Sequence, residues 1–293
     1  KEAQKEGAEI ILRSTVKKVK KKEGETKLTI STAGGEEIRA RVVIGADGAR
    51  SAVAKMAGMN VTKNFLNCVQ VEGGYEIDEA FAEIFVGKTI APGFFAWAIP
   101  LGAEGIARIG LCIDKRFSPH PNPLLFLKRN LSEHPVIARK YKGSSSHVTA
   151  GTIPIPVGAV QTVRRDNEVG IILVGDAAAQ VKPITGGGVY YGMKCGKIAG
   201  EIAAKASSMG DMKVLKTYER RWRKEIGKEI AFGLKVHRLR CLMSDKDFDT
   251  IFHTLSQDKV VQLIKRKGDM DYPSVVFREF LKHPRLQKHR LEE

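Results

Sequence analysis

Residues 169–206 read VGIILVGDAAAQVKPITGGGVYYGMKCGKIAGEIAAKA, and this stretch decides the fold class. The apolar run that begins at Val169 predicts a buried strand, which ends at Gly175-Asp176. Open α/β sheets bind their ligands beyond the carboxyl ends of their strands. We therefore expect the Asp176 carboxylate to face a bound ligand.

A triple glycine, Gly186, Gly187 and Gly188, follows this strand after a short loop. Glycines let a backbone approach a flat or phosphorylated ligand because no Cβ stands in the way. The helix predicted over 187–206 points its free N–H groups and the positive end of its dipole at the same place. A glycine-rich turn often only reverses the chain, but this combination of strand, Gly-Asp, triple glycine and helix predicts a ligand site. Small residues recur along the helix and permit close packing on a neighbour: Gly192, Gly196, Ala199, Gly200, Ala203 and Ala204.

An Asp-Gly pair lies in residues 42–58, VVIGADGARSAVAKMAG. Asp47-Gly48 again ends an apolar strand, and Arg50-Ser51 opens a short helical stretch. Asp-Gly by itself usually marks a turn. Its position between a strand and a helix makes it a candidate for the same ligand site.

Residues 92–100 read PGFFAWAIP and form a third candidate site. Because side chains alternate along a strand, Phe95, Trp97 and Ile99 share one face. That face is either part of an ordinary sheet core or the lining of a tunnel for an apolar chain.

The remaining pattern predicts an α/β domain interrupted by an antiparallel sheet. Strands are predicted at 9–19, 26–32 and 38–46, between 64 and 114 at close spacing, and at 147–157 and 160–163. Helices are predicted over 124–141 and through most of 211–293. The expected domains are an α/β part over 1–62, a sheet domain over 63–165, an α/β return over 166–208 and a helical region over 209–293.

The chain has 293 residues, a formal net charge of +16, 43% hydrophobic residues and 28% charged residues. This composition is typical of a soluble globular protein. The positive charge fits an anionic membrane surface, a phosphorylated lipid, nucleic acid or simply a solvated basic surface. Since no RRM, KH, zinc-finger or helix-turn-helix pattern is present, we expect no nucleic-acid partner.

The four cysteines, Cys68, Cys112, Cys195 and Cys241, are far apart and form no CxxC pair. This spacing argues against a metal site and against a disulfide framework, and it favours a reducing, cytoplasmic location.

Residues 169–206 resemble the second FAD-binding motif of the para-hydroxybenzoate hydroxylase-like flavoproteins. Within that superfamily they are most similar to the geranylgeranyl reductases, in particular the archaeal digeranylgeranylglycerophospholipid reductases. The resemblance implies that Asp176, beside Gly175, accepts a hydrogen bond from the ribitol of FAD. It also implies that Gly187, Gly188 and Val189 lie near the pyrimidine edge of the flavin, where a helix N-terminus stabilises the reduced, anionic form.

The other two segments extend this resemblance. In the related hydroxylases the motif at Asp47-Gly48 helps to hold FAD and a pyridine nucleotide, and the position of Val16 contacts the adenine through its backbone. Residues 92–100 resemble the reductase signature Pro-x-x-Tyr-x-Trp-x-Phe-Pro, with Phe95 in place of Tyr and Ile99 in place of Phe. The resemblance implies a substrate site formed by Phe95, Trp97, Ile99 and Pro100.

The family fold implied is an FAD-binding, Rossmann-like domain with an inserted substrate-binding sheet and a helical C-terminal region. The chain has no GxGxxG after a first strand and starts at Lys1. We therefore expect it to begin partway into that fold, without the first βαβ unit.

The implied activity is FAD-dependent reduction of C=C bonds in the geranylgeranyl chains of an archaeal-type membrane phospholipid. Its partners would be the isoprenoid glycerophospholipid, an electron donor that is NAD(P)H or ferredoxin-like, and the anionic inner face of the membrane. No catalytic acid can be assigned, although Tyr190 and Tyr191 are candidates by position, and Lys182 is a candidate ligand for the flavin or the lipid phosphate. The alternatives are an aromatic monooxygenase, an electron-transfer flavoprotein partner, or a non-catalytic binding protein for lipid or nucleic acid.

Overall fold

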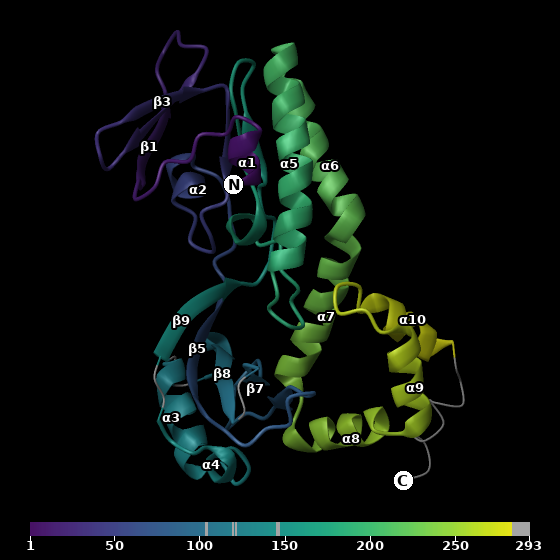
Figure 1. Ribbon diagram of the computed structural model, residues 1–293. Helices are drawn as coiled ribbons and strands as arrows, with labels where there is room; N and C mark the ends of the chain where they lie inside the picture. The colour runs from purple at the N-terminus through teal and green to yellow at the C-terminus, as the bar shows by residue number, and fades with distance from the viewer. Residues whose placement is uncertain (103–104, 119, 121, 145–146, 283–293) are drawn as a thin grey trace. The chain divides into compact units, whose positions relative to one another are not determined.

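A computed structural model describes residues 1–102, 105–118, 120, 122–144 and 147–282 (Figure 1). The chain divides into two compact units. The first unit consists of residues 1–61, 159–180 and 191–225, and the second of residues 62–158, 181–190 and 226–293. The chain passes between the units several times, so each unit is assembled from separate segments.

Two three-stranded sheets form the framework of the first unit. The first is antiparallel, in the order β1 (Val16–Lys21), β2 (Leu28–Thr32), β3 (Glu37–Ala40). The second has the order β10 (Val163–Arg165), β11 (Gly170–Leu173), β4 (Val42–Gly45). Strands β11 and β4 are parallel, and every residue of β11 is buried. Their carboxyl ends therefore lie at one edge of this sheet.

Helices complete the first unit: α1 (Glu2–Lys5), α2 (Ala52–Met56), most of α5 (Val189–Met209) and α6 (Lys216–Trp222). Glycines permit the closest contacts in its core. A Cβ on Gly45 would stand 2.9 Å from Leu173 Cδ2 and 3.0 Å from Val53 Cγ1. The strand end before Asp47 is thus packed tightly between β11 and α2.

A five-stranded antiparallel sheet forms the centre of the second unit. Its order is β6 (Glu83–Phe85), β7 (Ala96–Pro100), β8 (Ile106–Asp114), β5 (Phe65–Gly74), β9 (His147–Pro154). One face carries Val71, Ala98 and Ile109, which pack with Leu127 of α3 (Pro123–Glu133). The opposite face carries the aromatic residues of the third candidate site. The predicted combination of an α/β domain with an antiparallel sheet is confirmed.

Helices after residue 225 belong to the second unit: α7 (Lys228–Leu242), α8 (Asp245–Leu255), α9 (Asp258–Lys267) and α10 (Ser274–Leu281). Ser244 forms a capping box with Asp247 at the start of α8, which satisfies two backbone donors that have no partner inside the helix. No described helix combines the length and the apolar character that crossing a bilayer requires.

Four expected elements differ from the structure. The strand predicted over 38–46 is divided into β3 and β4, which lie in different sheets, and the strand predicted over 160–163 begins only at Val163, as β10. The helix predicted over 124–141 is divided into α3 and α4 (Ile137–Lys140), and His134 between them is extended. Pro135 explains the break, because a proline disfavours helical backbone in the residue before it. The strand predicted from residue 9 begins only at Val16, which pairs with Thr32 of β2.

The expectation that the cysteines form no disulfide is wrong. Cys68 and Cys112 stand opposite each other on β5 and β8 and are joined by a disulfide, with their Cα atoms 4.1 Å apart. Their sequence separation of 44 residues conceals this proximity, which the pairing of the two strands creates. Cys195 and Cys241 are free thiols.

Candidate functional site

The two aspartate motifs, Asp47-Gly48 and Gly175-Asp176, follow neighbouring parallel strands of the first unit. Leu173 of β11 is paired with Gly45 of β4, and Val174 N–H donates to the Gly45 carbonyl over 3.0 Å. Asp47 and Asp176 come shortly after these paired strand ends. The structure therefore brings the two predicted aspartates to the same edge of one sheet.

Asp47 uses both carboxylate oxygens to hold the start of α2. Its Oδ1 accepts from Ser51 Oγ over 2.6 Å, and its Oδ2 accepts from Val53 N–H over 3.0 Å. Ser51 Oγ in turn accepts from Ala54 N–H as the N-cap of the helix. Gly48 has a φ of +82°, which allows the strand to turn into this cap. In this arrangement Asp47 orients α2.

Asp176 is in a different environment. Its side chain is half-buried, and burial raises the pKa of its carboxyl above the ordinary value. Among the residues that the structure describes, none donates a hydrogen bond to its carboxylate. Its oxygens are not among the fully buried atoms that lack a partner, so they are accessible from outside the chain. The Asp176 carboxylate is therefore available to a hydroxyl of a ligand.

A buried side-chain network holds the turn that carries Asp176. Gln180 Oε1 accepts from Gly175 N–H over 2.9 Å, and Gln180 Nε2 donates to Tyr218 Oη over 3.0 Å. Tyr218 Oη donates to the Leu173 carbonyl over 3.1 Å. Gln180 and Tyr218 are both 0% exposed. Sequence reasoning missed these two residues, since an isolated Gln and an isolated Tyr carry no motif.

Helix α5 packs directly on the same turn. A Cβ on Gly175 would lie 3.7 Å from Gly192 Cα, and one on Gly192 would lie 3.6 Å from Gly175 Cα. Gly175 also has a φ of +63°, which other residues rarely adopt. The small residue predicted on the helix face thus allows α5 and the Asp176 turn to meet backbone to backbone.

The triple glycine belongs to the second unit, where it packs on the aromatic face of the sheet. Gly186 has a φ of +76°, and a Cβ there would stand 2.8 Å from Ile153 Cδ1 and 3.5 Å from Phe94 Cζ. The Lys182 carbonyl accepts from Gly186 N–H over 2.8 Å, and Lys182 N–H donates to the Gly187 carbonyl over 3.0 Å. These bonds close a compact turn.

Three polar candidates near this turn have partners of their own. Lys182 Nζ forms an ion pair of 2.7 Å with Asp271. Tyr190 Oη lies 3.3 Å from Tyr272 Oη, and Tyr191 is buried, with 1% exposure. Gly188 precedes α5, whose first residue, Val189, is 79% exposed. The start of this helix is thus open to solvent at Val189.

The aromatic motif lies on β7 and just before it. Phe95 and Trp97 rings meet edge to face with centroids 6.0 Å apart, and Ile99 is 41% exposed. Pro100 ends the strand. Trp97 pairs with Gly110 of β8, and a Cβ on Gly110 would stand 2.6 Å from Trp97 Cζ2. The indole therefore lies flat over the backbone of β8 and forms an apolar surface.

Val16 begins β1, in the other sheet of the first unit, and packs at the edge of the core formed by Val19 and Ile30. Its backbone pairs with Thr32 of β2. The described residues place it in a different sheet from the strand ends that carry Asp47 and Asp176.

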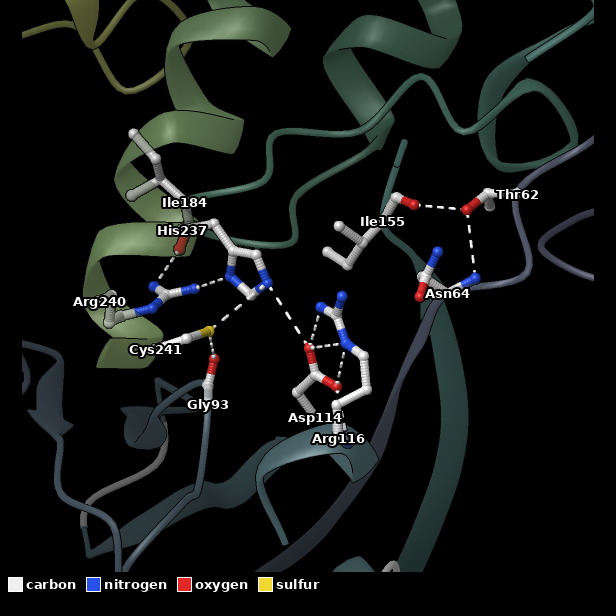
Figure 2. A network of polar contacts seen from close by, with 10 residues as sticks. All are labelled: Thr62, Asn64, Gly93, Asp114, Arg116, Ile155, Ile184, His237, Arg240 and Cys241. Atoms are coloured by element: carbon white, nitrogen blue, oxygen red, sulfur yellow. Dashed lines mark hydrogen bonds and ion pairs between the residues drawn. The ribbon is translucent and has the colours of Figure 1, made fainter. Parts of the chain in front are cut away.

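A charged network centred on the buried Asp114 and His237 lies in the second unit, and no sequence motif pointed to it (Figure 2). Arg116 Nε donates to both carboxylate oxygens of Asp114, over 3.0 and 3.1 Å. His237 Nε2 lies 3.7 Å from Asp114 Oδ2, and Arg240 Nη2 lies 2.8 Å from His237 Nδ1. Burial acts to raise the pKa of Asp114, but hydrogen bonds to His237 and Arg116 outweigh it and hold that pKa well below its usual range.

Asp114, His237 and Cys241 present ligand atoms within 4.8 Å of one another, which raises the question of a metal ion. A guanidinium can only donate, so His237 Nδ1 accepts from Arg240 and the ring hydrogen is on Nε2. Nε2 is the atom that faces Asp114 and Cys241. With a hydrogen there it has no lone pair for a metal. The cluster is a hydrogen-bonded network in this arrangement.

The chain is similar to one known protein family and to several named relatives. The profile of the FAD binding domain family matches residues 1–231. A digeranylgeranylglycerophospholipid reductase 2 of Methanothermobacter thermautotrophicus is 34% identical over 257 residues, which are 83% of this chain and 62% of the relative. A digeranylgeranylglycerophospholipid reductase of Methanothrix thermoacetophila is 34% identical over 272 residues, 89% of this chain and 66% of the relative. The chain thus spans a little under two thirds of these relatives.

Among solved structures, a geranylgeranyl bacteriochlorophyll reductase-like protein from Thermoplasma acidophilum matches with a TM-score of 0.75 and 22% identity. The match covers 96% of this chain and 72% of that one. The flavin-dependent brominase Bmp2 matches with a TM-score of 0.63 and 17% identity, over 97% of this chain and 73% of that one. At these identities the likeness concerns the fold.

The predicted resemblance to geranylgeranyl reductases is confirmed by these relatives, and the family match supports FAD as the cofactor. Because that match extends over residues 1–231 of 293, the chain belongs to the FAD binding domain family.

Proposed function

We propose that this chain belongs to an FAD-dependent reductase that saturates the C=C bonds of geranylgeranyl chains in an archaeal-type glycerophospholipid. The named relatives support this reaction class. The observation that carries the proposal is the Asp176 carboxylate, which is half-buried at a strand end and receives no hydrogen bond from the described residues.

The residues present fit the polar chain of a flavin. Asp176 offers acceptor oxygens to a ribitol hydroxyl, and its turn is fixed by Gln180 and Tyr218. In this proposal Gly187, Gly188 and Val189 supply backbone N–H groups to the flavin ring, because the start of a helix favours negative charge. Asp47, with Gly48, orients α2 beside the Asp176 turn.

The apolar face of the sheet supports an isoprenoid substrate. Ile99 is exposed, Phe95 and Trp97 are partly exposed, and Phe95 has no hydroxyl that would need a partner. An unactivated alkene offers no charged handle, so its reduction depends on orientation in a dry site. The reduced flavin supplies the hydride when it is bound. The chain's own residues orient the alkene and exclude water, while the source of the proton is unassigned.

Flavin binding is tested first on the unmodified chain, by quenching of FAD fluorescence. Asp176→Ala removes a charged hydrogen-bond acceptor, so we expect FAD affinity to fall about tenfold or more. Asp166→Asn is the matched control, because Asp166 pairs with Lys21 at the surface of the same unit and should leave affinity unchanged. If the unmodified chain binds no FAD, or if Asp176→Ala binds FAD as tightly, the flavin assignment is overturned.

The reaction is tested by incubating the chain with reduced FAD and a geranylgeranylated glycerophospholipid, followed by mass spectrometry. Stepwise gain of hydrogen pairs is the expected result. An unchanged lipid together with bound FAD would reject the reductase and favour an electron-transfer role. Hydroxylation of an aromatic substrate would favour a monooxygenase.

The partners we propose are the lipid substrate, an external electron donor, which is NAD(P)H or a ferredoxin-like protein, and an anionic membrane surface. The membrane proposal is supported by the net charge of +16 and by exposed basic side chains along α6 and the π-helical segment Arg223–Gly227 that follows it. A peripheral enzyme gains about 1 kcal/mol for each Lys or Arg that lies near an anionic bilayer.

A further inference from the structure

A pocket of about 230 Å³ lies in the second unit, between the loop before β7, the 3₁₀ turn after β8 and the helices α7 and α8. Its walls are mainly apolar and include Phe94, Phe117, Met243 and Phe248, while Lys88 and Arg240 contribute the charged side chains. The volume equals that of roughly eight water molecules. The pocket therefore accepts a compact molecule with a substantial apolar part.

Arg240 is unusual among the charged residues around this pocket. Its Nη1 donates to the Ile184 carbonyl and its Nη2 to His237 Nδ1, each over 2.8 Å, and its guanidinium lies 4.2 Å from the centroid of the Phe94 ring. Its Nε is buried and has no hydrogen-bond partner. Burial lowers the pKa of Arg240 to about 10. Three of its five N–H donors thus lack an acceptor among the described residues.

The Asp114 carboxylate, which belongs to the same network, does not neutralise the positive charge of Arg240. Asp114 accepts three hydrogen bonds from the Arg116 side chain and one from the Arg116 backbone N–H. Among the described residues no carboxylate forms an ion pair with Arg240. With the ring hydrogen of His237 on Nε2, the network contains two guanidinium groups and one carboxylate (Figure 2). It therefore carries one uncompensated positive charge beside the pocket.

Arg240 is half-buried, and its Nε is fully buried without a partner. A cation removed from water with unsatisfied donors is unfavourable in a native protein unless something binds it. Guanidinium groups recognise carboxylates and phosphates, which accept its parallel N–H donors. We propose that this pocket is a binding site for a small organic anion, in which one phosphate or carboxylate group meets Arg240 and an apolar body contacts Phe94, Phe117 and Phe248.

The proposal is tested by titrating the chain calorimetrically with hexyl phosphate, hexanoate, hexanol and inorganic phosphate. We expect saturable binding of at least one of the two amphiphilic anions, and binding at least about tenfold weaker for hexanol and for inorganic phosphate. Hexyl phosphate binding alone identifies a phosphate site, and binding of both anions identifies a general anion site. Equal binding of hexanol, or no binding of either anion, overturns the proposal.

Substitutions test whether the anion binds at Arg240. Arg240→Met should weaken binding of the anion about tenfold or more, whereas Arg240→Lys should retain part of it. Asp245 accepts a hydrogen bond from Lys88 N–H beside the pocket, so Asp245→Asn removes a negative charge there and should leave anion binding unchanged or stronger. Undiminished binding by Arg240→Met contradicts the proposal.

A measurement on the unmodified chain guards against a variant that fails to fold. Cys241 lines the pocket and is a free thiol. The rate at which iodoacetamide alkylates Cys241 is measured by peptide mass spectrometry. A bound anion should slow this alkylation, while hexanol at the same concentration should leave the rate unchanged. An unprotected Cys241 at saturating anion would contradict the assignment. The titrations and the alkylation require neither FAD nor turnover. A negative result in them therefore leaves the reductase proposal intact, and a failure of the reductase proposal leaves the anion site intact.

Discussion

The side-chain oxygen of Gln180 accepts a hydrogen bond of 2.9 Å from the backbone N–H of Gly175. This bond closes the turn that carries Asp176, and Tyr218 extends it to the carbonyl of Leu173 on β11. A buried Gln and a buried Tyr thereby determine where a predicted ligand-binding carboxylate lies.

Tyr218→Phe removes the hydroxyl and leaves Gln180 Nε2 and the Leu173 carbonyl without this partner. Since unsatisfied buried groups are unfavourable, we expect the free energy of unfolding to fall by about 1–3 kcal/mol in urea titrations. Tyr190→Phe is the control, because Tyr190 is 41% exposed and its loss of a hydroxyl should change stability by less than about 0.5 kcal/mol. Equal effects of the two variants would refute a special role for Tyr218.

Asp176→Asn should make the chain more stable at pH 7. Burial raises the pKa of Asp176 above 3.8, so the folded state holds the proton more tightly than the unfolded state, and the ionised carboxylate opposes folding at neutral pH. That opposition is lost as the pH falls through the raised pKa toward 3.8. Urea titrations from pH 7 to about 4 should show that the extra free energy of unfolding of Asp176→Asn decreases as the pH falls. A variant less stable than the unmodified chain at pH 7 would contradict this.

Gly110→Ala should displace the Trp97 indole, because the new Cβ would stand 2.6 Å from Trp97 Cζ2 and 2.6 Å from Gln70 Cβ. Overpacking of this kind lowers stability by about 1–3 kcal/mol. A changed tryptophan emission spectrum and a lower urea midpoint are the expected readouts. Gly151→Ala on β9 is the matched control, since nothing lies within 4 Å of its Cβ. An unchanged spectrum in Gly110→Ala would show that the indole does not lie over β8.

Reduction of the Cys68–Cys112 disulfide should destabilise the second unit. The bond closes a loop across 44 residues of sequence, and loops of this size contribute about 2–4 kcal/mol by restricting the unfolded chain. Unfolding is compared with and without dithiothreitol. The double variant Cys68→Ala/Cys112→Ala should show no response to the reductant, and a response in that variant would assign the effect to another thiol.

Neutralising Lys216, Arg220 and Lys224 by substitution with Gln should weaken binding to anionic phosphatidylserine vesicles by about 3 kcal/mol, or roughly a hundredfold. All three side chains are exposed. The control is the triple Gln variant of Lys17, Lys18 and Lys20, which changes the net charge equally on β1. Vesicle binding is measured by sedimentation. An equal loss of affinity in the two triple variants would show that only the total charge matters, and unchanged affinity in both would contradict the membrane proposal.

Local signals in the sequence predicted much of the secondary structure. Alternation places Phe95, Trp97 and Ile99 on one face, and apolar runs before Asp47 and Asp176 mark strands that end at a turn. Pro135 carries equally local information, and the division of the predicted helix at 124–141 follows from it. Such features depend on residues close in the chain, so the sequence contains what is needed to infer them.

Pairings between distant segments were decided only by the tertiary structure. The disulfide depends on the register of β5 with β8, and the uncompensated charge of Arg240 depends on α7 meeting the end of β8. The spacing of the cysteines argued against the disulfide between Cys68 and Cys112, and residue type alone left Gln180, Tyr218 and His237 without a role. The physical reason is that burial and hydrogen-bond partners, which set the chemistry of a polar side chain, come from segments that only folding brings together.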